Sequence, residues 1–246
     1  MGGWILSGLA VCNLYKTYHI QKRTVPVLKG LSLTLPEDGI TVILGKSGCG
    51  KTTLLRLLAG LEEPDDGEII LPQGQGVGMV FQEPRLMPWL DVTGNILFGL
   101  DKYERAHYPS KELLELVGLE GFGAAYPHQL SGGMQSRVAI ARVIACDPAV
   151  ILMDEPFAAL DNFNREAMQR ELIRIEQTRH KSIVFVTHNL DEALVLGGRI
   201  VFMADGAVSR EWDLSRWKYP RNLLDDAFIA YKKEMVAFFN QEETFN

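Results

Sequence analysis

The stretch "ITVILGKSGCGKTTLLRLLAGL", residues 40–61, holds two apolar segments on either side of a glycine-rich turn. The first six residues form a β-branched run that ends in Gly45, a pattern typical of a buried strand. From residue 52 onward, leucines recur at helical spacing, which predicts a helix. The sequence therefore predicts strand, glycine turn and helix in direct succession.

The glycine turn has the residues needed to hold phosphate groups. Gly45, Gly50, Lys51 and Thr52 fit the pattern G-x-x-x-x-G-K-[ST], in which backbone N–H groups and the helix N-terminus converge on a β-phosphate. Lys51 would reach the β- and γ-phosphates, and the Thr52 hydroxyl would ligate Mg²⁺. We expect the nucleotide to bind along the whole turn, at Gly45, Lys46, Ser47, Gly48, Cys49, Gly50, Lys51, Thr52 and Thr53.

Two more apolar runs predict a parallel sheet. Residues 149–156, "AVILMDEP", and 182–188, "SIVFVTH", are continuous apolar segments that end in polar residues. Such runs suit strands that helices cover on both faces, so the fold class is α/β with a mainly parallel sheet. Ligands bind beyond the carboxyl ends of such strands. Asp154, Glu155 and His188 lie at these ends, as the glycine turn does, which predicts a single site.

These polar residues suit distinct catalytic roles. Asp154 suits a contact to Mg²⁺, and Glu155 is placed to polarise an attacking water. His188 would lie where a γ-phosphate is sensed, and Gln82 in "MVFQEP" could touch both Mg²⁺ and the water. On their own, the same residues could be a capped turn, a strand-end histidine bonded to the backbone and an exposed loop glutamine. The glycine turn in the same chain favours the catalytic interpretation.

A second glycine turn, in "HQLSGGMQSRVAIAR" at residues 128–142, also leads into a predicted helix. Ser131 offers a hydroxyl, while Gly132 and Gly133 clear the helix N-terminus for close approach to a γ-phosphate. The chain therefore carries two potential phosphate cradles.

The remaining segments divide the chain into regions. Short strand candidates at 5–20, 25–36 and 67–81 predict a small antiparallel sheet beside the α/β core, and residues 90–145 predict an inserted helical region. A helical stripe near the C-terminus is expected to pack on its own domain, with a partner surface as the alternative. Its apolar residues are Leu224, Phe228, Tyr231, Met235 and Phe238.

Composition excludes several classes of protein. The 246 residues carry a net charge of −6, which argues against nonspecific nucleic-acid binding. The three cysteines form neither a metal-binding spacing nor a disulfide framework, which favours a reducing compartment. No run approaches the roughly 18 apolar residues of a membrane-spanning helix. The apolar N-terminus lacks the preceding basic residues of a signal peptide, so we expect an edge strand there.

Taken in order, "GKSGCGKTT", "FQEP", "LSGGMQ", "ILMDEP", "LD" at 160–161 and "TH" at 187–188 resemble the nucleotide-binding domain of ATP-binding-cassette (ABC) transporters over nearly the whole chain. The resemblance implies one domain, 1–246. It would comprise a P-loop NTPase (RecA-like) core with an antiparallel β subdomain at about 1–89 and 146–215, a helical subdomain at about 90–145, and a helical tail at about 216–246. It also implies an ATPase that uses ATP and Mg²⁺. Two copies would pair head to tail, so that each ATP lies between the glycine turn of one copy and the "LSGG" of the other.

The same resemblance assigns two further residues. Tyr18 in "KTYHI" matches the aromatic that stacks on adenine, although an aromatic on an edge strand is more often a packing residue. Asp161, after "PFAAL", matches the loop that links the two sites across the dimer. Ser136 and Asn189 depart from the family pattern, where a glutamine and an acidic residue are common. These departures weaken the match to a subfamily more than the expected activity.

The segment "FQEPRLMPWLDVTGNILFGL", residues 81–100, together with "YPR" at 219–221, resembles importers of nitrate, sulfonates and taurine. That resemblance implies a peripheral subunit on the cytoplasmic face of the membrane. Its partners would be permease subunits and, indirectly, an extracytoplasmic solute-binding protein. Residues 84–98 would form part of the groove that receives a permease helix, with Trp89 as the anchor. The alternative is that Trp89 fills the core of its own domain.

Other functional classes fit the sequence less well. ABC-type ATPases of translation or DNA maintenance usually carry two cassettes or long coiled coils, whereas this chain has one P-loop and no heptads. A regulator that has lost hydrolysis is disfavoured because Glu155, Gln82 and His188 are all present. An exporter is disfavoured because no membrane domain is fused to the chain and because residues 81–100 resemble importers.

Overall fold

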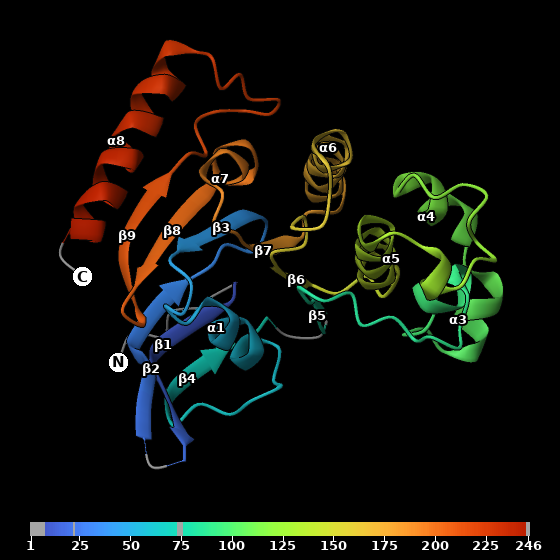
Figure 1. Cartoon of the computed structure of the whole chain (residues 1–246), viewed down its shortest axis with the longest axis horizontal. Coiled ribbons are helices and arrows are strands. Elements are labelled where there is room, and N and C mark those ends of the chain that lie inside the picture. Colours follow the sequence, from blue (N-terminus) through green and yellow to red (C-terminus); the bar gives the residue numbers. More distant parts are fainter. Residues whose placement is uncertain (1–7, 22, 73–75, 245–246) are drawn as a thin grey trace.

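The computed structural model describes residues 8–21, 23–72 and 76–244. Within them, the larger sheet has the strand order β5-β6-β7-β3-β8-β9 (Figure 1). All neighbouring strands pair in parallel except β8 and β9, which pair antiparallel. The predicted parallel α/β sheet is confirmed. Its strands are β3 (Gly39–Gly45), β5 (Val77–Val80), β6 (Val150–Asp154), β7 (Ser182–Val186), β8 (Arg199–Ala204) and β9 (Ala207–Asp213).

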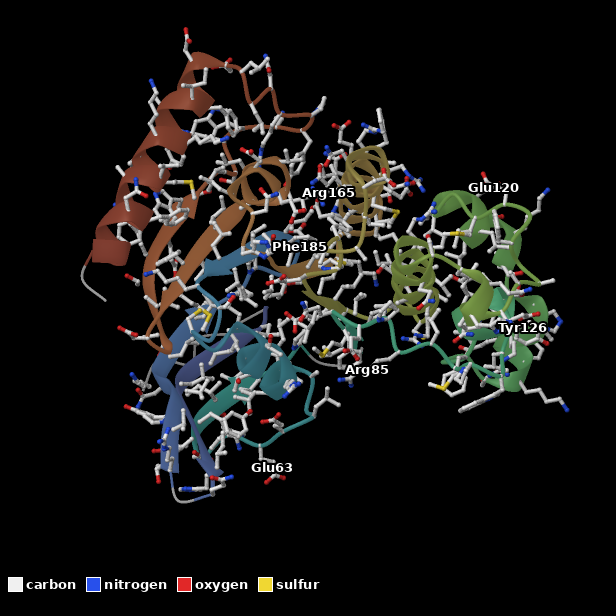
Figure 2. All side chains as sticks on the ribbon, viewed as in Figure 1. Glu63, Arg85, Glu120, Tyr126, Arg165 and Phe185 are labelled. Carbon is white, nitrogen blue, oxygen red and sulfur yellow. The ribbon has the colours of Figure 1, made fainter. Side chains whose placement is uncertain are left out.

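The central strands are mainly apolar because both faces of the sheet are covered. Successive side chains of a strand point to opposite faces, so Ile151 and Met153 of β6 join one core while Val150 and Leu152 join the other. Phe185 of β7 belongs to the first core (Figure 2). Its ring centroid lies 5.1 Å from that of Phe157. The first core lies under α5 (Gly132–Ala145), α6 (Asn162–Arg179), α7 (Leu190–Leu196) and α8 (Asp226–Thr244), and the second lies under α1 (Lys51–Leu58) and the smaller sheet.

The smaller sheet is antiparallel with the order β2-β1-β4, and its strands are β1 (Ala10–Ile20), β2 (Arg23–Thr34) and β4 (Asp66–Ile70). The strand candidates at 5–20 and 25–36 are confirmed here, apart from residues 5–7, which lie outside the described residues. The candidate at 67–81 is wrong as one strand of this sheet. Pro72, which has no N–H to donate, follows β4, and Val77–Val80 instead form β5 beside β6 in the parallel sheet.

Residues 90–145, all of them described, contain helices and no strand. Asp91 caps the first helix by accepting a hydrogen bond from the backbone N–H of Gly94, 2.7 Å away, and Asp101 caps the next in a capping box with Glu104. Figure 1 shows this region extending away from the parallel sheet. Its elements are α2 (Val92–Ile96), α3 (Lys102–His107), α4 (Ser110–Leu116), the 3-10 turn η1 (Pro127–Gln129) and α5.

The C-terminal helix α8 packs on β8 and β9 of its own chain (Figure 1). Phe228 and Met235 are buried, and the Phe238 ring lies 5.4 Å from the Phe202 ring. The prediction that this helix docks on its own domain is therefore confirmed. Leu224 is an exception: it precedes the helix and is 82% exposed, because α8 begins only at residue 226. None of the helices in the described ranges is long and apolar enough to cross a membrane.

Candidate active site

The glycine turn joins the end of β3 to the start of α1, as the sequence predicts. Gly50 stands at the N-terminus of α1 with a φ of 106°, in the left-handed region that favours glycine. A Cβ on Gly45 would lie 2.5 Å from the backbone oxygen of Met203, so neighbouring strand β8 also requires glycine at that position. Backbone geometry therefore explains both glycines without reference to any ligand.

Lys51 points its ammonium group back into the turn. Its side chain is 7% exposed, and Nζ donates hydrogen bonds to the backbone oxygens of Gly45 at 2.7 Å and Lys46 at 2.8 Å. A buried cation is thus held at the centre of the loop by neutral oxygens. Phosphate oxygens would be stronger partners for it, because hydrogen bonds between charged groups are roughly twice as strong as neutral ones.

A cavity of about 550 Å³ opens over this turn and brings most of the predicted residues together. Three strand ends and the first turn of α1 contribute to its wall. It is lined by Val27, Ser47, Gly48, Gly50, Lys51, Thr52, Thr53, Gln82, Asp154, Glu155 and His188. Of these, only Val27, an apolar residue of β2, was not singled out from the sequence.

Asp154 and Thr52 form the part of this wall that suits a metal ion. Asp154 ends β6, is buried, and accepts a hydrogen bond from the Thr52 side chain. Burial raises the pKa of the Asp154 carboxyl, and the charge of Glu155 adds to this rise, while the Thr52 hydrogen bond and Lys51 oppose it. A hydroxyl, a carboxylate and the amide oxygen of Gln82 are all hard oxygen donors, so this set fits Mg²⁺.

Glu155 turns out of the strand direction immediately after Asp154. Its φ is 45°, and its backbone N–H donates to the Val186 oxygen at 3.0 Å. A non-glycine residue in this region costs about 1–3 kcal/mol and often marks a functional site. The turn carries its carboxylate to within 3.1 Å of His188 Nδ1. Since the His188 side chain is 69% exposed, this pair lies at the open side of the cavity.

Tyr18 lies beside the cavity on β1, against the first turn of α1. Its hydroxyl donates a hydrogen bond to Glu62, and its side chain also bonds that of Thr53. Burial, followed by Glu62, raises the pKa of the Tyr18 hydroxyl. These contacts hold the ring next to the glycine turn, a position that suits the predicted stacking on adenine. The contact from Tyr18 to Glu62 was not predicted, because Glu62 belongs to no recognisable sequence motif.

The second glycine turn lies elsewhere in the chain. Ser131 caps α5 by accepting a hydrogen bond from the Met134 N–H at 3.3 Å. A Cβ on Gly132 would meet only the Ala159 Cβ at 3.8 Å, whereas one on Gly133 would lie 3.1 Å from the Ala159 backbone oxygen. Internal packing therefore explains why residue 133 is glycine, whereas the packing around residue 132 would accept a larger residue. The structure describes all three residues of this turn, and none lines the cavity of the first turn.

Asp161 begins α6 and also lies away from that cavity. Its carboxylate accepts hydrogen bonds from the Asn164 backbone N–H at 3.0 Å and the Asn164 side chain, and these bonds lower the pKa of Asp161. The two departures from the family pattern have local explanations. Asn189 caps α7 with its side-chain oxygen, as an acidic residue would, and Ser136 donates to the Gly132 oxygen at 3.1 Å.

The glycine turn with Lys51 and two carboxylates thus share one edge of a parallel sheet, the arrangement that P-loop NTPases have. The ABC transporter family model matches residues 28–158. The chain is 39% identical to the aliphatic sulfonates import ATP-binding protein SsuB of Bacillus cereus, over 95% of this chain and 96% of that protein. It is 44% identical to the taurine import ATP-binding protein TauB of Rhizobium johnstonii, over 78% of each.

A solved dimeric structure of the ATP-binding cassette MJ0796, in a post-hydrolysis state bound to ADP and Pi, superposes with a TM-score of 0.77 and 33% identity. The superposed region covers 84% of this chain and 98% of the MJ0796 chain. The chain therefore belongs to the ABC transporter family. As a member it is an ATPase that uses ATP and Mg²⁺, as the sequence predicts.

Proposed function

We propose that two copies of this chain close head to tail around two ATP molecules and drive a membrane permease that imports a small anion. The observation that carries this proposal is the separation of the two cradles. The cavity over Lys51 and the open N-terminus of α5 at Ser131 belong to different parts of one chain. A second copy in the opposite orientation would bring its Ser131 to the γ-phosphate held by Lys51.

The residues at the cavity would divide the chemistry of hydrolysis among them. Lys51 would hold the β- and γ-phosphates, while Thr52 and Asp154 would hold Mg²⁺ with help from Gln82. When bound, Mg²⁺ neutralises charge that develops on the phosphates. Glu155 would orient an attacking water and accept its proton. His188 would contact the γ-phosphate while its other nitrogen keeps the 3.1 Å contact to Glu155.

Four more assignments complete the nucleotide sites. Tyr18 would stack on adenine from β1, and Asp161 would reach the partner's site from the start of α6. Gly132 would admit the γ-phosphate that the partner holds, and Ser131 would donate its hydroxyl to it. We also propose the division of the chain at about residues 89, 145 and 215 into core, helical subdomain and C-terminal tail.

The permease contact is proposed at the turn that carries Trp89, which is 68% exposed and so does not fill its own core. The buried Asn95 fixes this turn: its side chain bonds the backbone of Met87 at 2.7 Å and 3.1 Å and the Leu90 oxygen at 3.0 Å. A rigid turn that presents a large aromatic to solvent suits a helix-binding groove. Arg142 of α5 supports the same segment by donating to the Pro84 oxygen at 3.1 Å.

The relatives named for import of aliphatic sulfonates and taurine support a sulfonate as the solute. We place the subunit at the cytoplasmic face of the membrane, with a solute-binding protein as an indirect partner and no nucleic acid. The test uses membrane vesicles that contain this chain together with a permease and a solute-binding protein of a sulfonate importer, with ATP on the side of the membrane that carries this chain. Labelled taurine should accumulate, and a Glu155→Gln chain should abolish the accumulation. Vesicles that accumulate labelled nitrate but not labelled taurine would contradict the sulfonate proposal.

A further inference from the structure

Glu192 is a buried carboxylate on α7 that lies outside the nucleotide cavity. Its Oε2 accepts a hydrogen bond from the Thr187 hydroxyl at 2.6 Å. Its other oxygen, Oε1, lies 3.4 Å from Nε of Arg165 on α6. Figure 2 shows Arg165 in the region between α6 and α7. One side chain thus links the end of β7 to a neighbouring helix.

The Thr187 end of this link is tied to the nucleotide cavity. Thr187 is buried and directly precedes His188, and its hydroxyl also accepts a hydrogen bond from the Asn189 N–H at 3.0 Å. Its own backbone N–H donates to Ile43 of β3 at 3.2 Å, two residues before the glycine turn. Any shift of Glu192 therefore acts on the backbone that carries His188.

The Arg165 end is tied to the turn that carries Asp161. Arg165 Nη2 donates to the Leu160 oxygen at 3.0 Å, and Nη1 lies 3.4 Å from the Asn162 side-chain oxygen. These contacts flank Asp161 on both sides. A path of polar contacts therefore runs from Thr187, which precedes His188, through Glu192 and Arg165 to Leu160 and Asn162, which flank Asp161.

We infer that Glu192 and Arg165 are positioning residues that couple the His188 turn to the Asp161 turn. This inference rests on the proposed dimer, in which His188 faces the nucleotide of its own chain and Asp161 faces that of the partner. A change at one nucleotide site then reaches the other through a single charged pair within one subunit.

The contact between Arg165 and Glu192 suits the transmission of movement between the His188 turn and the Asp161 turn better than it suits holding the two turns rigid. Within the described residues, the buried Nε of Arg165 has no hydrogen-bond partner, although it lies 3.4 Å from a carboxylate oxygen. Such a contact can shorten into a hydrogen bond when either turn moves. Glu192 is buried and Arg165 is partly exposed, and ion pairs of this kind are a weak source of stability compared with apolar packing, so stability alone does not account for the pair.

A double-mutant cycle on the full chain tests the coupling. Glu192→Gln keeps the acceptor for Thr187 but removes the charge that faces Arg165, and Arg165→Gln removes the guanidinium. Each should lower kcat about tenfold, and the double variant should lose about tenfold rather than the product of the two, because the residues act as a unit. The Kd for ATP should stay within about twofold of wild type, since neither residue lines the cavity. Glu166→Gln is the control: Glu166 forms an exposed ion pair with Arg170 at 3.8 Å, and kcat should not change.

Three outcomes would overturn the coupling: wild-type kcat in Glu192→Gln, multiplicative losses in the double variant, or a loss of ATP affinity that matches the loss of kcat. The proposed dimer is tested separately, by size-exclusion chromatography of Glu155→Gln with ATP and Mg²⁺. If that dimer forms and Glu192→Gln keeps wild-type kcat, the coupling alone is wrong. If no ATP-bound dimer forms, the proposed dimer falls, and the coupling falls with it.

Discussion

Replacing Gly132 by alanine separates the contribution of this residue to the stability of the chain from its proposed role in binding the partner's γ-phosphate. Gly132 is the first residue of α5, and its φ lies outside the left-handed region. An added Cβ would meet only the Ala159 Cβ, at 3.8 Å, an ordinary van der Waals distance. The isolated chain can therefore accept alanine without strain.

The two expected effects have opposite signs. Alanine is favoured over glycine in a helix by up to about 1 kcal/mol, which in a chain of this size raises Tm by roughly 2–4 °C. In the proposed dimer, however, the methyl group would stand where the partner's γ-phosphate approaches the N-terminus of α5. Loss of one hydrogen bond to a charged group costs about 1.5–3 kcal/mol, so hydrolysis should fall about 10- to 100-fold.

Thermal denaturation and phosphate release measure these two effects on the same samples. Gly133→Ala is the matched control, because its Cβ would lie 3.1 Å from the Ala159 oxygen and 3.2 Å from Leu160 Cδ2. This variant should be less stable than Gly132→Ala. If Gly132→Ala were stable and fully active, Gly132 would not face a phosphate. A destabilised Gly132→Ala would show that the packing argument is wrong.

Three further predictions address the first cradle and the permease contact. Lys51→Ala should weaken ATP binding about 100-fold or more, because two phosphates lose a charged donor. Titration with a fluorescent nucleotide measures this affinity, and an unchanged affinity would exclude Lys51 from the site. Asp154→Asn should abolish Mg²⁺-dependent hydrolysis yet stabilise the nucleotide-free chain at pH 7. The raised pKa of Asp154 means that its ionised carboxyl destabilises the folded chain. This destabilisation is absent below the unfolded pKa of about 3.9 and grows as the pH rises above it. Urea titrations at pH 4 and 7 should therefore show a higher free energy of unfolding for Asp154→Asn only at pH 7. Trp89→Ala should leave stability within about 0.5 kcal/mol, since the side chain is 68% exposed, but reduce co-purification with the permease. Lost stability with intact assembly would show that Trp89 packs internally.

The sequence predicted the core best where one physical constraint dominated. Continuous apolar runs identified β3, β6 and β7 because strands buried on both faces leave no polar alternation. The segment 67–81 could not be divided between two sheets, since both of its halves are short and local pattern carries no information on which edge a strand joins. Likewise, Leu224 continues a helical stripe in sequence, but the helix starts two residues later.

The candidate site was predictable as far as its residues belong to known spacings. Asp154 ends a strand and Lys51, Glu155 and His188 come after strands, and the parallel topology brings all four to one cavity. Gly133 shows the limit: its contact with the Ala159 oxygen depends on packing between distant segments. Glu192 was also missed, although its position three residues after the helix-capping Asn189 is a recognisable capping pattern. Its contact to Arg165 depends on how α6 packs against α7.

The central claim is that one copy's glycine turn meets the other copy's Ser131 across ATP. Size-exclusion chromatography of Glu155→Gln with ATP and Mg²⁺, beside a phosphate-release assay, tests it most directly. Because glutamine keeps the size of the side chain but cannot accept a proton, hydrolysis should fall about 100-fold or more and the ATP-bound dimer should accumulate. Adding Ser131→Arg to the same chain should leave ATP binding intact and return the protein to the monomer. A Glu155→Gln chain that hydrolyses ATP normally, or a double variant that still dimerises with ATP, would contradict the account.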